Sequence, residues 1–160
     1  MIYRNATSSD LKRCFEIRGQ TQDNAFNESE LAAIGVTEES WSSLIEDGTF
    51  TGNVASTNDI VIGFCFGDTK TGEILVLAVL KGHEGMGIGK SLLEKTSADL
   101  FSIGHNKLWL AASATPIVRA YGFYRSVGWH PTNTFDENGD EILTKRKIII
   151  DQRNQPDQIR

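Results

Sequence analysis

Cysteine is scarce in this sequence, which has only 2 among its 160 residues. Cys14 and Cys65 lie far apart, and no cluster of cysteine and histidine surrounds either of them. A metal site needs several ligands at short spacing, so we expect no metal centre. Both thiols are expected to be reduced and buried, as free cysteine in proteins usually is.

Long apolar runs and dense basic runs are also absent. The longest apolar run, Ile74 to Leu80, is far shorter than the ~20 residues that a membrane-spanning helix needs. Residues 1–10 lack the charged and apolar regions of a signal peptide, so we expect a cytoplasmic protein with no membrane partner. Because the net charge is -5 and lysine and arginine form no cluster, we expect no nucleic-acid partner.

What remains is the composition of a globular protein, with 39% hydrophobic and 23% charged residues. A chain of 160 residues is long enough to bury a core without disulfides or metals. We therefore expect residues 1–160 to form a single domain.

The first half of the chain predicts two helices and several strands. One helix is expected after an N-cap at Ser8 and another after Thr37, with a loop or broken helix over residues 20–35 between them. Runs rich in β-forming residues predict strands at 2–6, 50–55, 60–66 and 73–80. The last of these is nearly continuous in apolar residues, which indicates a strand covered on both faces.

The second half predicts two more helices and three strands. A helix is expected from about Ile88 to a stop at Gly104, and another from Pro116 to about Val127. Strands are expected at 107–112, 129–135 and 141–150, the last two as a hairpin around Asn138-Gly139. The order is mixed α/β, and its central strand–loop–helix–strand unit should pair its two strands in parallel.

The segment between the strand at 73–80 and the following helix is rich in glycine. Gly85, Gly87 and Gly89 alternate along it. Glycine adopts positive φ readily and allows a ligand to approach the backbone. The start of a helix also has unpaired N–H groups and a partial positive charge. Together these features predict an anion site suited to phosphate.

Two common phosphate-binding motifs fit this loop poorly. A dinucleotide fingerprint, Gly-x-Gly-x-x-Gly, opens the first βαβ unit of its fold, whereas this loop lies past mid-chain and its third glycine comes one residue early. A nucleoside-triphosphate loop ends in Gly-Lys-Ser, as Gly89-Lys90-Ser91 does. That motif also needs a glycine at position 84, where this chain has Glu84.

The same segment resembles the coenzyme A loop of the GNAT superfamily of N-acetyltransferases, whose pattern is Gln/Arg-x-x-Gly-x-Gly/Ala. Gly87 and Gly89 match its two glycines, while Glu84 stands where the family has Gln or Arg. In an anion site, the carboxylate of Glu84 is expected to point away from the phosphates.

A second resemblance lies downstream, at the separation that the family shows. Residues 120–129 are similar to the family signature Ala-x-x-x-Tyr-x-x-x-Gly-Phe, with Tyr124 at the tyrosine and Trp129 replacing the Phe. Ile117 stands where the family often has Asn. The resemblance extends loosely from residue 1 to about 150.

The resemblance implies a GNAT-like fold and an acyltransferase activity. The fold would be a mixed central sheet of about six to seven strands with a splayed parallel pair, flanked by about four helices. The activity would be transfer of an acetyl group from acetyl-CoA to a primary amine, by direct attack in a ternary complex. A non-catalytic acyl-CoA-binding or regulatory module is the alternative. A homodimer is the default oligomer.

The resemblance also assigns residues to the acetyl-CoA site. The pantetheine arm would pair with the strand at 77–79, and the pyrophosphate would lie on the N–H groups of 85–90. The implied cofactor-binding residues are Leu77, Ala78, Val79, Glu84, Gly85, Met86, Gly87, Ile88, Gly89, Lys90, Ser91, Ile117, Phe123 and Tyr124.

Three catalytic roles are implied. The backbone N–H of Val79 would donate to the thioester oxygen. Tyr124, whose phenol has a pKa of about 10, would protonate the departing thiolate, although a tyrosine that merely packs is the alternative. Glu73 is a candidate general base, with a solvated carboxylate as the alternative. His83 is expected to lie too far from the acyl carbon to take that role.

The acceptor site in such folds is built from the loop after the first helix and from the last hairpin, here residues 20–35 and 135–141. Both segments are rich in acids, which would favour a cationic amine, whereas the alternative is ordinary solvated loops. Small amines, antibiotics, amino acids and protein N-termini all stay open as acceptors.

Overall fold

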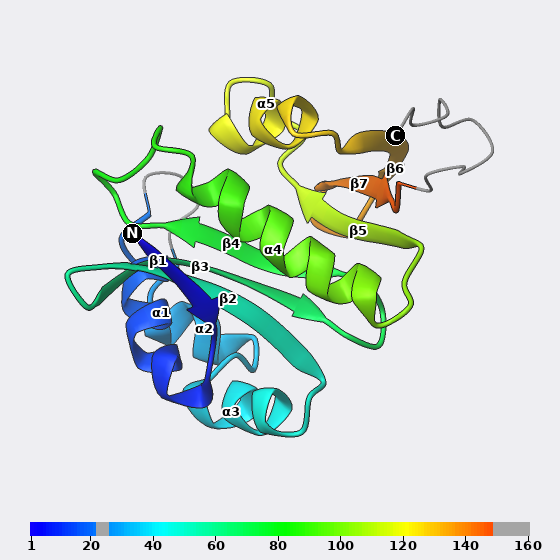
Figure 1. Ribbon diagram of the computed structural model, residues 1–160. Coiled ribbons are helices and arrows are strands. Elements are labelled where there is room, and N and C mark those ends of the chain that lie inside the picture. The colour runs from blue at the N-terminus through cyan, green and yellow to red at the C-terminus, as the bar shows by residue number, and fades with distance from the viewer. Residues whose placement is uncertain (22–25, 149–160) are drawn as a thin grey trace, which may run out of the picture.

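A computed structural model describes residues 1–21 and 26–148 of the chain (Figure 1). Its elements follow in the order β1 (Ile2–Asn5), η1 (Ser8–Asp10), α1 (Leu11–Arg18), α2 (Glu28–Ala33), α3 (Glu38–Glu46), β2 (Phe50–Thr57), β3 (Ile60–Asp68), β4 (Ile74–Val79), α4 (Ile88–Ser102), β5 (Lys107–Ala112), α5 (Arg119–Ser126), β6 (His130–Phe135) and β7 (Glu141–Arg146).

The strands form two antiparallel sheets, with orders β1-β2-β3-β4 and β5-β7-β6. One parallel bridge, Glu73 to Trp109, joins them, and the Trp109 N–H donates to the Gly72 carbonyl at 3.1 Å. The predicted mixed α/β class is confirmed, but the sheet is divided in two because β5 pairs along its length with β7. Since that bridge is the only strand pairing between β4 and β5 in the described chain, the splayed parallel pair stays a prediction.

The helices cover both faces of the first sheet (Figure 1). One core cluster lies between α4 and both sheets, and a second lies between the opposite face of the first sheet and α1 with α3. β3 is buried on both faces, because Cys65 points into the first cluster while Phe64 and Phe66 point into the second. None of the helices within 1–21 and 26–148 is long and apolar enough to cross a bilayer.

Close packing and buried hydrogen bonds set the position of α4. A Cβ added at Gly67 would lie 2.8 Å from Leu100 Cδ1, so only glycine lets this part of α4 approach β3. The buried Asn53 amide donates to Thr96 Oγ1 at 3.0 Å and to Asp99 Oδ2 at 3.0 Å. These contacts hold the C-terminal half of α4 against β2 and β3.

Some elements differ from their predicted bounds. α5 begins at Arg119, not at Pro116, because the Val118 N–H bonds to the Thr115 carbonyl in a turn that precedes the helix. The broken helix expected over 20–35 contains α2, and residues 22–25 of that range lie outside the described residues. The last strand ends at Arg146, and the predicted positions 149–150 also lie outside them.

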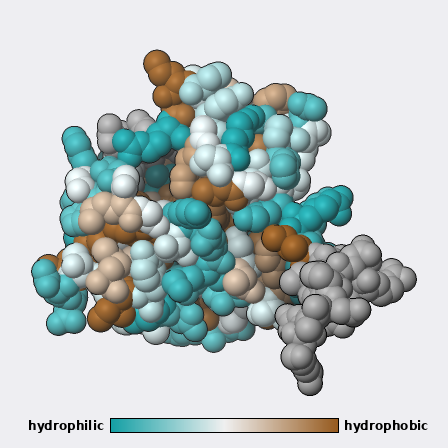
Figure 2. Space-filling model, turned by 45° about the horizontal axis from the view of Figure 1, so that its top comes forward, coloured by the Kyte–Doolittle hydropathy of each residue, from teal (hydrophilic) through white to brown (hydrophobic). Residues whose placement is uncertain are grey.

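Figure 2 shows apolar residues singly or in small groups among hydrophilic ones on the face that it presents. Exposed apolar residues that are scattered in this way are normal on protein surfaces and need no partner to explain them.

Candidate cofactor and active site

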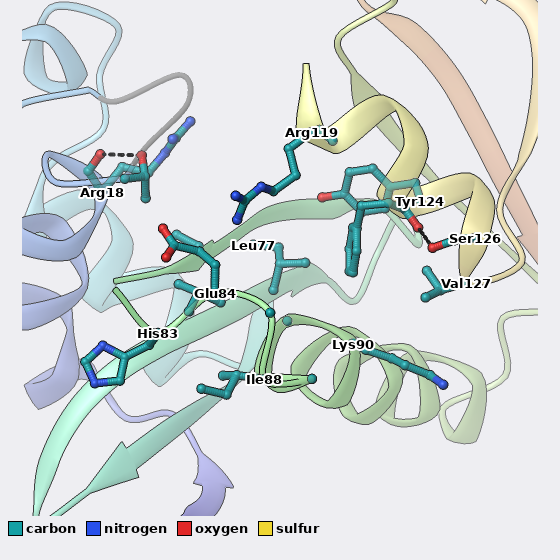
Figure 3. A pocket seen from close by; sticks show the side chains of 18 residues that line it. Arg18, Leu77, His83, Glu84, Ile88, Lys90, Arg119, Tyr124, Ser126 and Val127 are labelled. Carbon is teal, nitrogen blue, oxygen red and sulfur yellow. Dashed lines mark hydrogen bonds between the residues drawn. The ribbon is translucent and has the colours of Figure 1, made fainter. Parts of the chain in front are cut away.

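A cavity of about 480 Å³ lies where the end of β4, the glycine loop and the starts of α4 and α5 meet (Figure 3). The predicted cofactor residues in its wall are Leu77, Ala78, Val79, Glu84, Gly85, Gly87, Ile88, Gly89, Lys90, Phe123 and Tyr124. The structure does not bring Met86, Ser91 or Ile117 to the cavity. Met86 and Ile117 are 66% and 92% exposed, and the Ser91 N–H bonds to the Gly87 carbonyl.

The glycine loop adopts the conformation that an anion site requires. Gly85 and Gly87 both have φ of 79°, and Gly87 is the left-handed N-cap of α4. A Cβ added at either would meet nothing within 4 Å, so their positive φ, not crowding, is what calls for glycine. Within the described residues, we find no acceptor for the N–H groups of 87–90. These groups face a cavity that also bears the positive end of the helix dipole.

The edge of β4 that faces away from β3 is also available for pairing. The Leu80 N–H donates to the Ile62 carbonyl of β3 at 2.7 Å. Because backbone groups alternate in direction along an antiparallel strand, those of Leu77 and Val79 point away from β3. Past the Glu73–Trp109 bridge, no described strand pairs with this edge. An extended ligand can therefore hydrogen-bond to it as an added strand does.

Glu84 lies in the cavity wall, where the family has Gln or Arg. Its Oε2 accepts the Gly82 N–H at 2.8 Å, whereas its Oε1 is buried without a partner among the described residues. Hydrogen bonds from its own N–H and from that of Gly82 lower the pKa of the carboxyl, so it is ionised at neutral pH. These bonds fold the carboxylate back onto the loop within the cavity wall, and the expectation that it points away from the phosphates stays a prediction.

Tyr124 projects from α5 with its hydroxyl towards the cavity (Figure 3). Its ring packs edge-on against Phe123 and Trp129, with centroids 5.1 Å and 6.4 Å away. Burial raises the pKa of Tyr124 well above its usual value, and nearby Cys65 acts in the same direction while Arg18 opposes it. The phenol therefore stays protonated at neutral pH and has a proton to donate.

A partly buried ion pair joins the helix that carries Tyr124 to the second sheet. Arg125 Nη2 donates to both carboxylate oxygens of Glu141 on β7, at 2.7 Å and 2.8 Å. The Arg125 guanidinium also stacks on the Tyr121 ring, 3.6 Å from its centroid. Charge-assisted hydrogen bonds are stronger than neutral ones, so this pair helps to hold α5 against the second sheet.

Glu73, the candidate base, does not line the cavity. It precedes β4 at the end opposite the glycine loop, about 20 Å along the strand from Val79. Burial, with a smaller contribution from Asp68, raises the pKa of its carboxyl. The resemblance suggested Glu73 because it begins the central strand, and the rise along that strand carries it away from this cavity.

Neither cysteine is a nucleophile here. Cys14 and Cys65 are both free and buried, as the sequence predicted. Burial raises the pKa of each thiol to about 12, so the reactive thiolate is not formed at neutral pH. Within the described residues, no group of three or more His, Cys, Asp and Glu side chains is arranged to hold a metal ion.

Sequence reasoning missed several residues that line this cavity. Arg18 and Thr21 come from the end of α1 and the segment after it, and Arg119 and Ala120 begin α5. His83, which was expected to lie too far from the chemistry, is also in the wall. Two of these residues had a local signal: Arg18 follows Leu11 and Cys14 at helical spacing on one face of α1, and Ala120 is the first residue of the family signature.

Comparison with known proteins agrees with this geometry. The sequence model of the acetyltransferase (GNAT) family matches residues 7–129. No curated protein sequence matches the chain. The fold is similar to that of the PaiA N-acetyltransferase from Thermoplasma acidophilum in complex with coenzyme A, at 19% identity and a TM-score of 0.76, covering 92% of this chain and 100% of that one.

Two further solved structures share the fold. YncA from Salmonella typhimurium with acetyl-CoA has 16% identity and a TM-score of 0.69, covering 99% of this chain and 98% of that one. Ribosomal-protein-alanine N-acetyltransferase from Brucella melitensis has 20% identity and a TM-score of 0.68, covering 93% and 100%.

The fold and the family match thus define an acyltransferase that uses acetyl-CoA as its acyl donor. More narrowly, the chain belongs to the acetyltransferase (GNAT) family.

Proposed function

We propose that this chain is a single N-acetyltransferase domain over residues 1–160 that acetylates a primary amine by direct attack in a ternary complex. The observation that carries the proposal is one continuous cavity, which runs from the glycine-loop N–H groups to the Tyr124 hydroxyl along the free edge of β4. A cytoplasmic location and a homodimer stay predictions of the sequence.

The residues in the wall fit the donor. Acetyl-CoA, when bound, supplies an acetyl group activated as a thioester. The N–H groups of 87–90 would hold its phosphates, and the edge at Leu77 and Val79 would pair with the amide-bearing arm. The Val79 N–H, which points away from β3, would donate to the acyl oxygen.

Proton transfer at the leaving group is assigned to Tyr124. Its hydroxyl is protonated at neutral pH and lies in the cavity wall, so it can donate its proton to the sulfur as the C–S bond breaks and charge develops there. The acceptor amine must attack in its neutral form, and because Glu73 lies elsewhere, water in the cavity is the first proton acceptor that we propose. With Cys65 buried and protonated, direct attack is favoured over an acyl-cysteine intermediate.

Tyr124→Phe tests this assignment. We expect kcat to fall about 100-fold or more, since general acid catalysis contributes at least that much, while the Kd for CoA changes by less than about threefold. Thiol release from acetyl-CoA over a panel of amines gives kcat, and calorimetry gives Kd. Tyr121→Phe is the matched control, because Tyr121 lies on the same helix but outside the cavity wall.

Full activity of Tyr124→Phe would remove the acid role. A protein that binds CoA but acetylates no amine in the panel would instead be the non-catalytic binding module. Binding of ATP with magnesium in place of CoA would overturn both.

A further inference from the structure

A second cavity, of about 180 Å³, adjoins the first on the other face of the β1–β4 sheet. It lies among α1, α2, α3 and the ends of β3 and β4, and its wall is aromatic and aliphatic, with Phe26, Trp41, Phe64 and Val76 among its members. Within the described residues, Arg18 is the one charged side chain in this wall. An apolar cavity with a single cation at its margin selects a ligand that has both an apolar and an anionic group.

The two cavities meet at Arg18, which lines both. β4 also passes from one to the other: Leu75 and Val76 line the second cavity, while Leu77 and Val79 line the first. A ligand in the second cavity therefore lies next to the stretch of β4 that we assign to the acyl end of the cofactor. This placement makes the second cavity the acceptor side of the site.

The acids that favoured a cationic acceptor are not found in either wall. Of the described acids in the segments 20–35 and 135–141, none lines a cavity, and Glu141 is paired with Arg125. Asp23 lies outside the described residues. The expectation of a cationic amine thus loses its structural basis in the described chain.

The size of the second cavity matches a large apolar side chain. An apolar cavity of about 150 Å³ is enough to bind benzene. At about 180 Å³, this cavity can take an aromatic ring or a branched aliphatic group. Its aromatic members add edge-to-face contacts: the ring of Trp41 lies 5.6 Å from that of Phe66, and both line the cavity.

Arg18 suits a carboxylate. Burial lowers the pKa of its guanidinium, with nearby Tyr124 opposing that shift, so an anionic ligand stabilises the charged form. A guanidinium has several N–H donors in a planar fork, and it can bind a carboxylate while keeping other partners. Its packing over the Phe26 ring, 5.0 Å from the centroid, helps to orient that fork.

We propose that the acceptor is a free α-amino acid with a large apolar side chain, which places that side chain in the second cavity, its carboxylate on Arg18 and its α-amine in the first cavity. The inference rests on the proposed function. In the reaction the amide C–N bond forms, the acetyl C–S bond breaks, and the proton lost by the amine ends on the CoA thiol.

Steady-state thiol release with a matched set of amines tests the acceptor class. L-phenylalanine and L-leucine carry all three groups, L-alanine lacks the large side chain, phenethylamine lacks the carboxylate, and L-phenylalaninamide mimics a peptide N-terminus. We expect kcat/KM for phenylalanine and leucine to exceed that of each other amine by at least about tenfold.

Variants test whether Arg18 and the second cavity cause the preference for phenylalanine. Arg18→Gln should shrink the preference for L-phenylalanine over phenethylamine, and Arg18→Lys, which keeps the charge, should restore part of it. Val36→Phe, which fills the second cavity, should raise KM for phenylalanine more than for alanine. Ile103→Phe, at the exposed end of α4, is the control and should change neither ratio.

The failures of the two proposals are distinguishable. Equal use of alanine, phenethylamine or the amide overturns the amino-acid class while leaving the acetyltransferase intact. Calorimetric titration of L-phenylalanine into the CoA-saturated protein provides a readout without turnover. Absence of binding overturns the class, whereas binding without acetylation of any amine upholds the class and overturns the proposed activity.

Discussion

The two glycines that match the family pattern differ in what they require, and the pattern itself allows alanine only at the position of Gly89. Gly87 has φ of 79°, so an alanine there costs about 1–2 kcal/mol in backbone energy although its Cβ would meet nothing within 4 Å. At Gly89, inside α4, an added Cβ would lie at an ordinary 3.7 Å from Phe123 Cζ and Val79 Cγ2. Alanine fits at 89 and favours the helix by up to about 1 kcal/mol.

The consequences for CoA binding differ in the same way. Gly87→Ala relieves its strain only by turning towards negative φ, which rotates the loop N–H groups away from the cavity. We expect its CoA affinity to fall at least about tenfold, or 1.4 kcal/mol, and its unfolding free energy to drop by about 1–2 kcal/mol. Gly89→Ala should be as stable as the parent protein or more so, and should bind CoA within about threefold of it.

Two measurements test the predicted difference between Gly87→Ala and Gly89→Ala. Denaturant unfolding ranks the stabilities, and calorimetric titration with CoA gives the affinities. If Gly87→Ala bound CoA as tightly as the parent, the claim that the left-handed turn presents the phosphate donors would be refuted. A larger loss of stability in Gly89→Ala than in Gly87→Ala would refute the claim that position 87 requires positive φ and position 89 does not.

Two further predictions follow from charges in the described chain. Glu84→Gln should tighten CoA binding by about two- to fivefold, and more at low salt, because it removes a carboxylate from the cavity wall. Calorimetric titration with CoA at two ionic strengths checks this, and a gain in affinity that does not depend on salt would contradict it. Burial alone would raise the pKa of Asp10, but hydrogen bonds from Arg4 and Thr7 outweigh burial, so the pKa is lowered. Asp10 therefore stabilises the fold above its unfolded pKa of about 3.9, and this contribution is lost as the pH falls through the folded pKa. The difference in unfolding free energy between the parent protein and Asp10→Asn should close in acid, and a difference that does not vary with pH would rule this out.

Local signals predicted most of the elements. Thr37 begins α3 as expected, with its Oγ1 accepting the Ser40 N–H at 3.0 Å. The turn at Asn58 and Asp59 joins β2 to β3 with φ of 50° and 63°, as a two-residue hairpin requires. Each of these features depends on residues within one turn of the chain. Pro116 shows the limit, because the same proline suits a free-standing turn as well as a first helical turn.

The pairing of β5 was beyond the sequence. Residues 107–112 were predicted as a strand and 141–150 as half of a hairpin, and nothing local indicates that β5 pairs with β7 along its length while meeting β4 at one bridge only. Such pairing depends on contacts between distant segments, and a strand can satisfy its hydrogen bonds with either neighbour. The division into two sheets follows from that choice and leaves one edge of β4 without a strand partner past the bridge among the described residues.

The two halves of the proposed site differ in how well the sequence predicts them, because one half is contiguous in the chain and the other is assembled from distant segments. The proposed donor half is one contiguous strand–loop–helix unit, so its glycines and its cofactor were predictable from a short segment. The proposed acceptor half is assembled from α1, α2, α3 and β4, and residues such as Trp41 and Phe64 read as ordinary core because a cavity wall and a core share the same apolar pattern. Arg18, which packs over the Phe26 ring at the margin of this cavity, favours a binding site over ordinary core, since a charge is costly to bury. A family whose members share the donor half can therefore vary in acceptor through a few helix-borne side chains, without altering the loop that identifies it.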